Sequence, residues 1–320
     1  MKDSALFLLL KTARPRQWIK NLAVFAALFF SGFLFSELGE GYYFTTVSFA
    51  FLIFCLLTSS VYIINDIIDV EADRNHPFKK KRPIASGKLS TPVAIFGAGI
   101  CLMSVVFLSL WLSVFFKLMV LFYLVLQLLY AKYFKHIPIL DVSSIATGFL
   151  IRVYAGAVVV NLHMSVWFLL TVISASLFLA VGKRQSERTL ITGQSEAIMG
   201  NTRKILKRYS QRLLDQYTGM FATATWLTYA LFTFQFVNLA PQGDAAQIYN
   251  FLPKTLHSQK LLMLTLPLVI FGVMRYLQLI YESNQGESPE RVLLNDKPLL
   301  ITVFSFVLLS FVIIYLLNGV

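Results

Sequence analysis

Long apolar runs with almost no charged residues divide the chain into regular segments. The runs lie at about 18–36, 43–65, 92–113, 115–134, 139–160, 165–182, 217–239, 260–281 and 299–317. A helix needs about 20 apolar residues to cross the hydrocarbon layer of a bilayer, which is close to the length of each run. The pattern therefore predicts an all-α polytopic membrane protein with nine transmembrane helices.

The segment before the first run, residues 1–16, has a shorter apolar stretch than the nine runs and more basic residues. Its apolar stretch at 5–10 is followed by Lys11, Arg14 and Arg16. This stretch is too short for a membrane span or for the apolar region of a cleavable signal peptide. We expect residues 1–16 to hold a short helix that lies along the membrane interface.

Basic residues are distributed unevenly between the two sides of the predicted membrane. The chain has 28 Lys and Arg against 16 Asp and Glu, a net charge of +12, and 23 of the 28 fall in alternate segments that begin with the N-terminus. The positive-inside rule then predicts a cytoplasmic N-terminus and an outside C-terminus in an inner (plasma) membrane. Because topology accounts for the charge, nucleic-acid binding is not expected.

Two long polar loops, at 66–91 and 183–212, face the cytoplasm under this topology, and the outer loops are mostly short. We therefore expect the chemistry at the cytoplasmic face, within one integral-membrane domain over 1–320. A composition of 57% hydrophobic and 14% charged residues excludes a soluble enzyme. Two cysteines in apolar runs and four scattered histidines indicate neither a disulfide framework nor a zinc site.

A polar stripe, here called the acidic stripe, marks the C-terminal end of the second apolar run. Its members fall within roughly 100° of one another on a helix; they are Tyr62, Asn65, Asp66, Asp69 and Asp73. Carboxylates four residues apart repel unless a cation offsets them, and hard oxygen ligands suit Mg²⁺ that holds a diphosphate. A solvated helix end is the alternative interpretation.

A basic loop follows the acidic stripe directly, with the sequence RNHPFKKKRPIASG at 74–87. Pro77, Pro83 and Gly87 restrain its conformation, so its cations can be directed at phosphate oxygens. The positive-inside rule explains the number of charges equally well. Both interpretations stay open from the residues alone.

Further basic residues are candidates for phosphate binding. Lys183 and Arg184 open the loop after the sixth run, where topology is an equal explanation. Lys20 lies close to Trp18 in the sequence and is either an interfacial anchor or a site residue.

Polar residues at the start of the fifth run and within it are further candidates. Arg152 lies inside the run, where an unpaired guanidinium is costly. We expect it either to form an ion pair with the acidic stripe or to contact substrate. Where the fourth run gives way to the fifth, Lys132, Lys135 and Asp141 form a smaller polar edge, in which Asp141 is either a site residue or a helix N-cap.

These motifs resemble the UbiA superfamily of membrane prenyltransferases. The acidic stripe has the NDxxDxxxD form of that superfamily, and the resemblance is closest to the decaprenyl-phosphate phosphoribosyltransferases. It extends over nearly the whole chain, through segments at 15–21, 65–87, 135–156, 182–187 and 274–294. The resemblance implies helices around a central cavity open near the cytoplasmic face, and Mg²⁺-dependent transfer of 5-phosphoribose from phosphoribosyl diphosphate (PRPP) to a polyprenyl phosphate.

The resemblance also implies roles for individual residues. Asn65, Asp66, Asp69 and Asp73 would hold Mg²⁺ and the diphosphate, and the three aspartates would be the catalytic residues. The implied substrate-binding residues line the same cavity; they are Lys20, Tyr62, Lys79, Arg82, Lys135, Asp141, Arg152, Lys183, Arg184 and Glu187. Ordinary members of the superfamily carry a second acidic motif after the sixth span, where this chain has only Glu187, which argues against a prenyl diphosphate donor.

The chemistry of phosphoribosyl transfer agrees with these residues. Loss of pyrophosphate demands positive charge at the leaving group, whereas the acceptor phosphate is already ionised near pH 7 and needs no base. One alternative is a UbiA-type prenyltransferase with an aromatic acceptor, which would favour two acidic motifs. Another is a lipid-phosphate transporter, which would need a polar path to the outer face. A homo-oligomer is compatible with all three functions.

Overall fold

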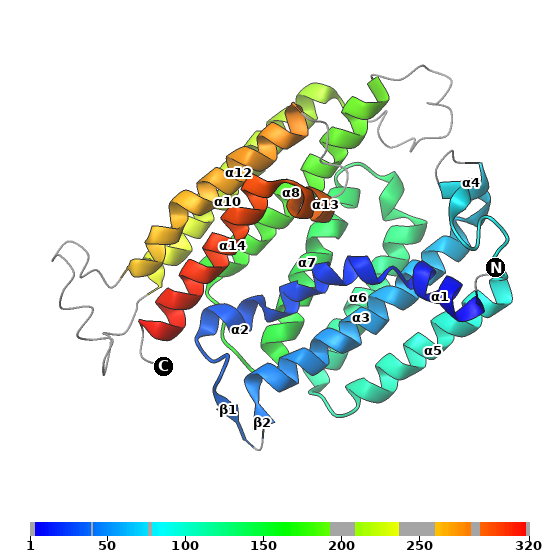
Figure 1. Ribbon diagram of the computed structural model, residues 1–320, viewed down its shortest axis with the longest axis horizontal. Coiled ribbons are helices and arrows are strands. Elements are labelled where there is room, and N and C mark those ends of the chain that lie inside the picture. Colours follow the sequence, from blue (N-terminus) through cyan, green and yellow to red (C-terminus); the bar gives the residue numbers. More distant parts are fainter. Residues whose placement is uncertain are drawn as a thin grey trace. The chain divides into compact units, whose positions relative to one another are not determined.

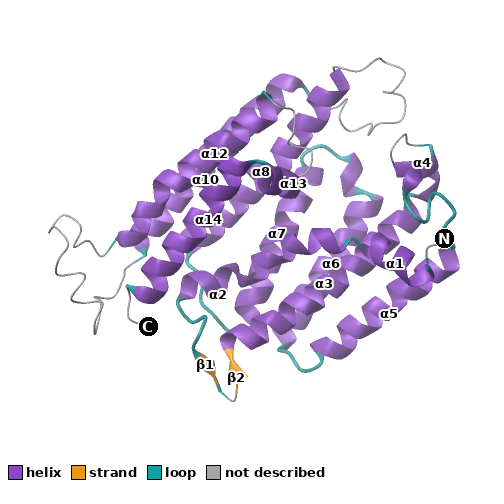
Figure 2. Cartoon of the chain, in the orientation of Figure 1, coloured by secondary structure: helices purple, strands orange, loops and turns teal. Residues whose placement is uncertain are grey.

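A computed structural model describes residues 4–39, 41–75, 79–192, 209–236, 260–282 and 289–317. Helices predominate within these residues, and the strands found there form one short antiparallel hairpin (Figure 2). Its strands are β1 (Glu37–Leu38) and β2 (Gly41–Tyr42), in which Glu37 pairs with Tyr42. The predicted all-α class is confirmed.

Seven helical segments in the described part of the chain are long and apolar enough to cross a membrane (Figure 1). They correspond to seven of the nine predicted spans, and they are α3 (Tyr43–Ile68), α5 (Thr91–Ser109), α6 (Val114–Lys132), α7 (Leu140–Val159), the Val166–Arg188 part of α8 (Val166–Thr192), η6 (Leu261–Thr265) with α12 (Leu266–Tyr281), and α14 (Lys297–Phe311) with η7 (Val312–Leu316). The chain is therefore an integral membrane protein.

The other two predicted spans contain helices, but one is broken into short helices and the other is less apolar than these seven. The first run begins in a 3-10 helix, η1 (Pro15–Phe25), and continues in the short helix α2 (Ala26–Ser31). The seventh run lies in α10 (Gln211–Gln235), where several threonines and polar aromatic side chains lower the hydropathy. The number of nine spans and the central cavity stay predictions.

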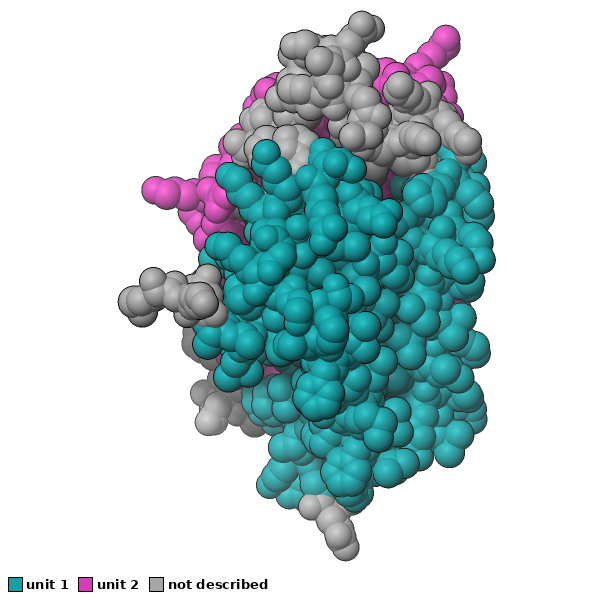
Figure 3. All heavy atoms as spheres, turned by 90° about the vertical axis from the view of Figure 1, so that its right-hand side faces the viewer, with its two compact units in different colours: residues 1–27, 35–162, 194–208 teal, residues 28–34, 163–193, 209–320 magenta. Residues whose placement is uncertain are grey.

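The chain divides into two compact units, which Figure 3 colours separately. Among the described residues, the first unit takes in 4–27, 35–39, 41–75 and 79–162, and the second takes in 28–34, 163–192, 209–236, 260–282 and 289–317. Each unit has a hydrophobic core of its own. The expectation of a single integral-membrane domain over 1–320 stays a prediction.

α3 is the central helix of the first unit, because α1 (Ala5–Ala13), η1, α5, α6 and α7 all pack against it. The predicted N-terminal helix is present as α1. η1 also packs on α7, where Gly156 permits a very close approach: a Cβ built on Gly156 would lie 1.8 Å from the carbonyl oxygen of Val24. This contact fixes η1, and with it Lys20, against α3 and α7.

In the second unit α8 packs along α10, and α12 packs on both α8 and α14. Phe178, Tyr276 and Ile280 belong to its core. The hydroxyl of Tyr315 donates to the carbonyl oxygen of Phe29 at 2.7 Å and so connects η7 to α2. The short helix α13 (Pro289–Asn295) precedes α14 and packs on it.

Candidate functional site

The acidic stripe occupies the C-terminal end of α3 and the short helix α4 (Val70–Arg74) that follows it. The two helices meet at Asp69, but the backbone hydrogen bonds continue across the junction. The Asp69 N–H donates to the Asn65 carbonyl at 2.9 Å, and the Asp73 N–H donates to the Asp69 carbonyl at 2.8 Å. The helical spacing that the sequence predicts is therefore present along the stripe.

Asp66 and Asp73 share one cation. Nη1 of Arg82 lies 3.0 Å from Oδ1 of Asp66 and 2.5 Å from Oδ2 of Asp73. Both carboxylates are almost completely buried, with 3% and 4% of their side chains exposed. The shared guanidinium offsets the repulsion between two like charges that the stripe brings onto one face.

Arg14 supplies a second cation to Asp66 and is absent from the site residues predicted above. Its Nη2 lies 2.5 Å from Oδ1 of Asp66, and its guanidinium carbon lies 5.1 Å from the centre of the Tyr62 ring. Arg14 has φ 54° and ψ 61°, between α1 and Pro15. This left-handed conformation costs a residue with a side chain about 1–2 kcal/mol, which the ion pair offsets. The only signal in the sequence was a basic residue between an apolar helix and a proline.

Asp69 pairs with a different cation. Its Oδ1 lies 2.7 Å from Nζ of Lys135, which belongs to η3 (Phe134–His136). The side chain of Asp69 is 37% exposed, so solvent screens this pair more than the pairs of Asp66 and Asp73. The structure thus brings Lys135 to the acidic stripe, and its role in substrate binding stays a prediction.

These six side chains form what is here called the acidic–basic cluster: Asp66, Asp69 and Asp73 with Arg14, Arg82 and Lys135. Within the part of the chain that the structure describes, these ion pairs join three carboxylates to three cations. A phosphate group that takes over the cations therefore leaves the carboxylates in need of another positive charge.

The cluster also bears on the predicted metal. Among the described residues, no three His, Cys, Asp or Glu side chains are grouped closely enough to hold a metal ion. The donor chemistry nevertheless suits one. Asp66 and Asp73 lie near enough to share a cation, and the buried Oδ1 of Asn65 has no hydrogen-bond partner in the described part of the chain. Such hard oxygen donors are the ligands that Mg²⁺ prefers.

The basic loop is folded into tight turns from residue 79 onward. η2 (Lys79–Lys81) opens this part, the Arg82 N–H donates to the Lys79 carbonyl at 2.9 Å, and the side chain of Ile84 is buried. The predicted restraint of the loop is therefore confirmed for these residues, and it holds Arg82 at the acidic stripe. Residues 76–78 lie outside the described part.

Arg152 is buried in the first unit, with 6% of its surface exposed. Its Nε donates to Oδ1 of Asn21 at 2.9 Å, Nη1 to the Gly148 carbonyl at 2.9 Å, and Nη2 to the Tyr123 hydroxyl at 2.6 Å. Its guanidinium also lies over the rings of Tyr123 and Phe149. The predicted ion pair with the acidic stripe is wrong, because neutral oxygens and aromatic rings solvate this charge instead.

Asn21 joins Arg152 to the helix that bears the acidic stripe. Its amide nitrogen donates to the Thr58 hydroxyl at 3.1 Å and to the sulfur of Cys55 at 3.4 Å, both on α3. The side chain is fully buried. A single amide in an apolar run forms no periodic pattern, so the sequence assigned no role to Asn21 beyond its place at the end of the matching segment 15–21.

Lys20 and Asp141, two of the predicted substrate-binding residues, differ in how far they are buried. Lys20 is half-buried on η1, where the Trp18 indole donates to the Ser59 hydroxyl of α3 at 3.0 Å. Asp141 is fully buried in the first turn of α7, whose N-cap residue is Ile139. The N-cap interpretation of Asp141 is therefore wrong, and its role in substrate binding stays a prediction.

Lys183, Arg184 and Glu187 belong to the second unit. The sequence assigned them to a loop, but α8 continues as a helix to Thr192, which corrects that assignment. Arg184 is fully buried and its Nη1 donates to Oε2 of Glu187 one turn later, while Lys183 is half-buried. A place for these three residues beside the acidic stripe stays a prediction.

The fold and the cluster define a helical integral membrane protein with a charged site at the end of one membrane-crossing helix. The chain belongs to the UbiA prenyltransferase family, whose model matches residues 22–295. The resemblance inferred from the motifs is thereby confirmed.

Three relatives, each named decaprenyl-phosphate phosphoribosyltransferase, are similar to this chain. The protein from Mycolicibacterium smegmatis is 39% identical over 232 residues, which cover 71% of this chain and 70% of the relative. The protein from Corynebacterium glutamicum is 32% identical over 317 residues, covering 97% and 87%. The protein from Mycobacterium tuberculosis is 36% identical over 231 residues, covering 70% and 73%.

Solved structures of UbiA homologues share the fold. The Archaeoglobus fulgidus homologue bound to GPP and Mg²⁺ matches with a TM-score of 0.67 and 18% identity, over 96% of this chain and 99% of that one. The same homologue bound to DMAPP and Mg²⁺ matches with a TM-score of 0.65 and 17% identity, over 96% and 98%. At these identities the likeness establishes the UbiA fold.

Proposed function

We propose that this protein transfers 5-phosphoribose from PRPP to a polyprenyl phosphate and releases pyrophosphate. The observation that carries the proposal is the acidic–basic cluster, in which Asp66 and Asp73 share Nη1 of Arg82 at 3.0 and 2.5 Å. Such a site suits substrates that bring several phosphate groups. The names of relatives that are 39% and 32% identical support the same reaction.

The leaving group sets the main catalytic demand. Breaking the bond between C1 of the ribose and the diphosphate oxygen develops positive charge on the ring and negative charge on pyrophosphate. Arg82 and Lys135 are the cations that we assign to the diphosphate oxygens, since both already bind oxygen anions at the acidic stripe. Their transfer from carboxylate to phosphate accompanies substrate binding in this proposal.

The acceptor needs no general base. The second pKa of a phosphate monoester is about 6, so this nucleophile is largely ionised near pH 7. An oxygen of the acceptor phosphate forms the new bond to C1 while the bond to pyrophosphate breaks. The protein then has to hold the two substrates in line and keep water away from C1. No histidine or cysteine is assigned a catalytic role.

Asn65, Asp66, Asp69 and Asp73 are the residues that would hold Mg²⁺, the proposed cofactor. When bound, Mg²⁺ supplies positive charge to the departing diphosphate. The carboxylates would need such a partner once the cations of the cluster have moved to phosphate groups. Oδ1 of Asn65 is buried and has no hydrogen-bond partner among the described residues, which supports this assignment, because such an oxygen is costly unless another ligand occupies it.

Prenyl transfer to an aromatic acceptor suits these residues less well. That reaction favours two acidic motifs and fewer cations directed at phosphate. Here the acidic residue of the sixth-span motif, Glu187, pairs with Arg184. In the described part of the chain, Arg14, Arg82 and Lys135 pair with the acidic stripe. A lipid-phosphate transporter would in addition need polar groups toward the other face of the membrane.

The charge distribution supports a location for the reaction. Twenty-three of the 28 basic residues lie in the segments assigned to the cytoplasm. We therefore propose an inner (plasma) membrane protein with its N-terminus in the cytoplasm, its C-terminus outside and its acidic–basic cluster at the cytoplasmic face.

An assay of two reactions tests the proposal. The purified full-length protein in detergent receives either PRPP labelled in the ribose with a polyprenyl phosphate, or a labelled prenyl diphosphate with 4-hydroxybenzoate. We expect Mg²⁺-dependent transfer of label in the first reaction and none in the second. Activity in the second reaction alone would overturn the proposal.

A further inference from the structure

The N-terminal helix α1 has two different faces. Leu6, Phe7 and Leu10 are 69%, 54% and 52% exposed, whereas Leu8 and Ala13 are buried. Three large apolar side chains directed away from the protein are unfavourable in water but favourable in lipid. In an integral membrane protein, the exposed face of α1 is therefore suited to the acyl region of the bilayer.

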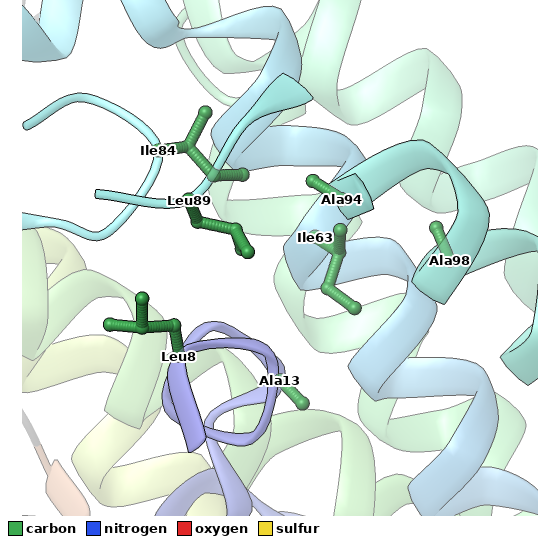
Figure 4. Close-up of a cluster of buried hydrophobic side chains, with 7 residues drawn as sticks. All are labelled: Leu8, Ala13, Ile63, Ile84, Leu89, Ala94 and Ala98. Atoms are coloured by element: carbon green, nitrogen blue, oxygen red, sulfur yellow. The ribbon is translucent and has the colours of Figure 1, made fainter. Parts of the chain in front are cut away.

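The buried face of α1 fixes the helix close to the acidic–basic cluster. Leu8 and Ala13 share a hydrophobic cluster with residues from the end of α3, the basic loop, the short stretch after it and the start of α5 (Figure 4); these are Ile63, Ile84, Leu89, Ala94 and Ala98. A Cβ on Gly97 of α5 would lie 2.5 Å from a methyl group of Leu9, so α1 also lies close to α5. The apolar surface and the charged site thus belong to one packed region.

Arg14 is the residue at which these two environments meet. It ends α1 and turns in the left-handed conformation before Pro15, and its guanidinium reaches Asp66 at 2.5 Å. Its side chain is 30% exposed. Asp66 also keeps Nη1 of Arg82 at 3.0 Å, so it does not lose its only cation when Arg14 moves. Arg14 can therefore move toward the exposed face of α1 while Asp66 keeps a cation.

We infer that Arg14 binds the phosphate head group of the polyprenyl phosphate acceptor, and that the Leu6, Phe7 and Leu10 face of α1 contacts the lipid chain next to it. This inference rests on the proposed function and adds a binding site for one of its two substrates. The acceptor is amphipathic, with an anionic group attached to a long apolar chain, and the end of α1 offers a cation beside an apolar surface. PRPP has no apolar chain and gains nothing from that surface.

Kinetics on the full-length protein test the inference. Initial rates of labelled phosphoribose transfer are measured with polyprenyl phosphate varied at saturating PRPP, and with PRPP varied at saturating polyprenyl phosphate. Arg14→Gln keeps a hydrogen-bond donor for Asp66 but removes the charge. We expect it to raise the KM for polyprenyl phosphate about tenfold or more while the KM for PRPP stays within about twofold.

The matched control is Arg16→Gln, which removes the same charge from an exposed position two residues away. Both KM values are expected to stay at the wild-type level in this variant. Arg14→Lys keeps the charge without the planar fork, so its KM for polyprenyl phosphate should be intermediate. If Arg14→Gln does not fold in detergent, the same comparison is made with Arg14→Lys.

An unchanged KM for polyprenyl phosphate, or a rise in the KM for PRPP alone, overturns the inference. An equal rise in Arg16→Gln overturns it as well, because the effect would then be one of general surface charge. If the wild-type protein transfers no phosphoribose at all, the proposed function fails instead, so the two failures are distinguishable.

Discussion

Asn21 and Arg152 lie 131 positions apart in the sequence, yet Nε of Arg152 donates to Oδ1 of Asn21 at 2.9 Å. The amide nitrogen of the same Asn21 donates to Thr58 on α3. One side chain therefore connects η1, α7 and the helix that carries the acidic stripe. It also helps to solvate a buried charge that has no carboxylate partner among the described residues.

Replacing Arg152 should destabilise the protein. Arg152→Met removes the charge but leaves Asn21 Oδ1 and the Tyr123 hydroxyl without their donor, which costs about 2–4 kcal/mol of unfolding free energy. Denaturant unfolding in detergent measures the change. Arg16→Met, at an exposed position, is the control and should stay within about 0.5 kcal/mol of wild type. Equal stability of the two variants would show that the Arg152 contacts contribute little.

Gly156 should tolerate no side chain. In Gly156→Ala the new Cβ would lie 1.8 Å from the Val24 carbonyl oxygen, so η1 and α7 must separate, at a cost of about 1–3 kcal/mol or more. Gly99→Ala on α5 is the matched control, because nothing lies within 4 Å of its Cβ. Alanine should there raise helix stability by up to about 1 kcal/mol. An unfolding temperature that falls by the same amount in both variants would contradict the close packing of η1 on α7.

Asp69 should matter for activity more than for stability. Its pair with Lys135 is partly exposed, so Asp69→Asn should unfold at nearly the wild-type temperature. Loss of a proposed Mg²⁺ ligand should lower kcat about 100-fold or more. Glu71→Gln, an exposed carboxylate on α4, should keep full turnover. Mg²⁺-dependent turnover at the wild-type rate in Asp69→Asn would count against the metal assignment.

Asp66 should matter for activity and for stability. Its carboxylate is 3% exposed and receives Arg14 and Arg82, so Asp66→Asn leaves two guanidinium groups without their shared anion. We expect lower turnover together with an unfolding temperature below that of Asp69→Asn. Measuring both variants in the same detergent separates the two roles. Equal unfolding temperatures would mean that the Asp66 ion pairs do not stabilise the first unit.

Asp296 should make the stability of the second unit depend on acid pH. Hydrogen bonds from Arg275 hold the pKa of Asp296 below its usual value, and the Leu299 N–H adds to this effect. Since the folded pKa is lower than the unfolded one, the stabilisation is fully present above about pH 4 and disappears as the pH falls through the folded pKa.

The measurement is thermal unfolding in detergent between about pH 5 and pH 3. Wild type should lose stability more steeply over this range than Asp296→Asn, which lacks the titrating group. Arg275→Gln removes the cation that lowers the pKa and should also flatten the profile. Parallel profiles for all three proteins would contradict the linkage.

The sequence predicted much of the fold because helix length and apolar character are properties of consecutive residues. Within the described residues, seven predicted spans coincide with helices that can cross a membrane. The common helical face of the acidic stripe could also be predicted from the sequence, since residues four apart share a face of any helix. Predictions at segment ends were weaker: residues 183–192 were assigned to a loop but continue α8, because charge alone does not end a helix.

The sequence by itself determined the membrane class, the family motifs and the helical face on which the aspartates lie, all of which depend on local spacing. Only the tertiary structure decided which cation meets which carboxylate. Arg14 reaches Asp66 across 52 positions and Lys135 reaches Asp69 across 66. Such pairs depend on how η1, α3 and α7 pack, on the close approach at Gly156 and on the left-handed turn at Arg14. No periodic pattern in the chain encodes those contacts, because they join elements whose separation is set by side-chain packing.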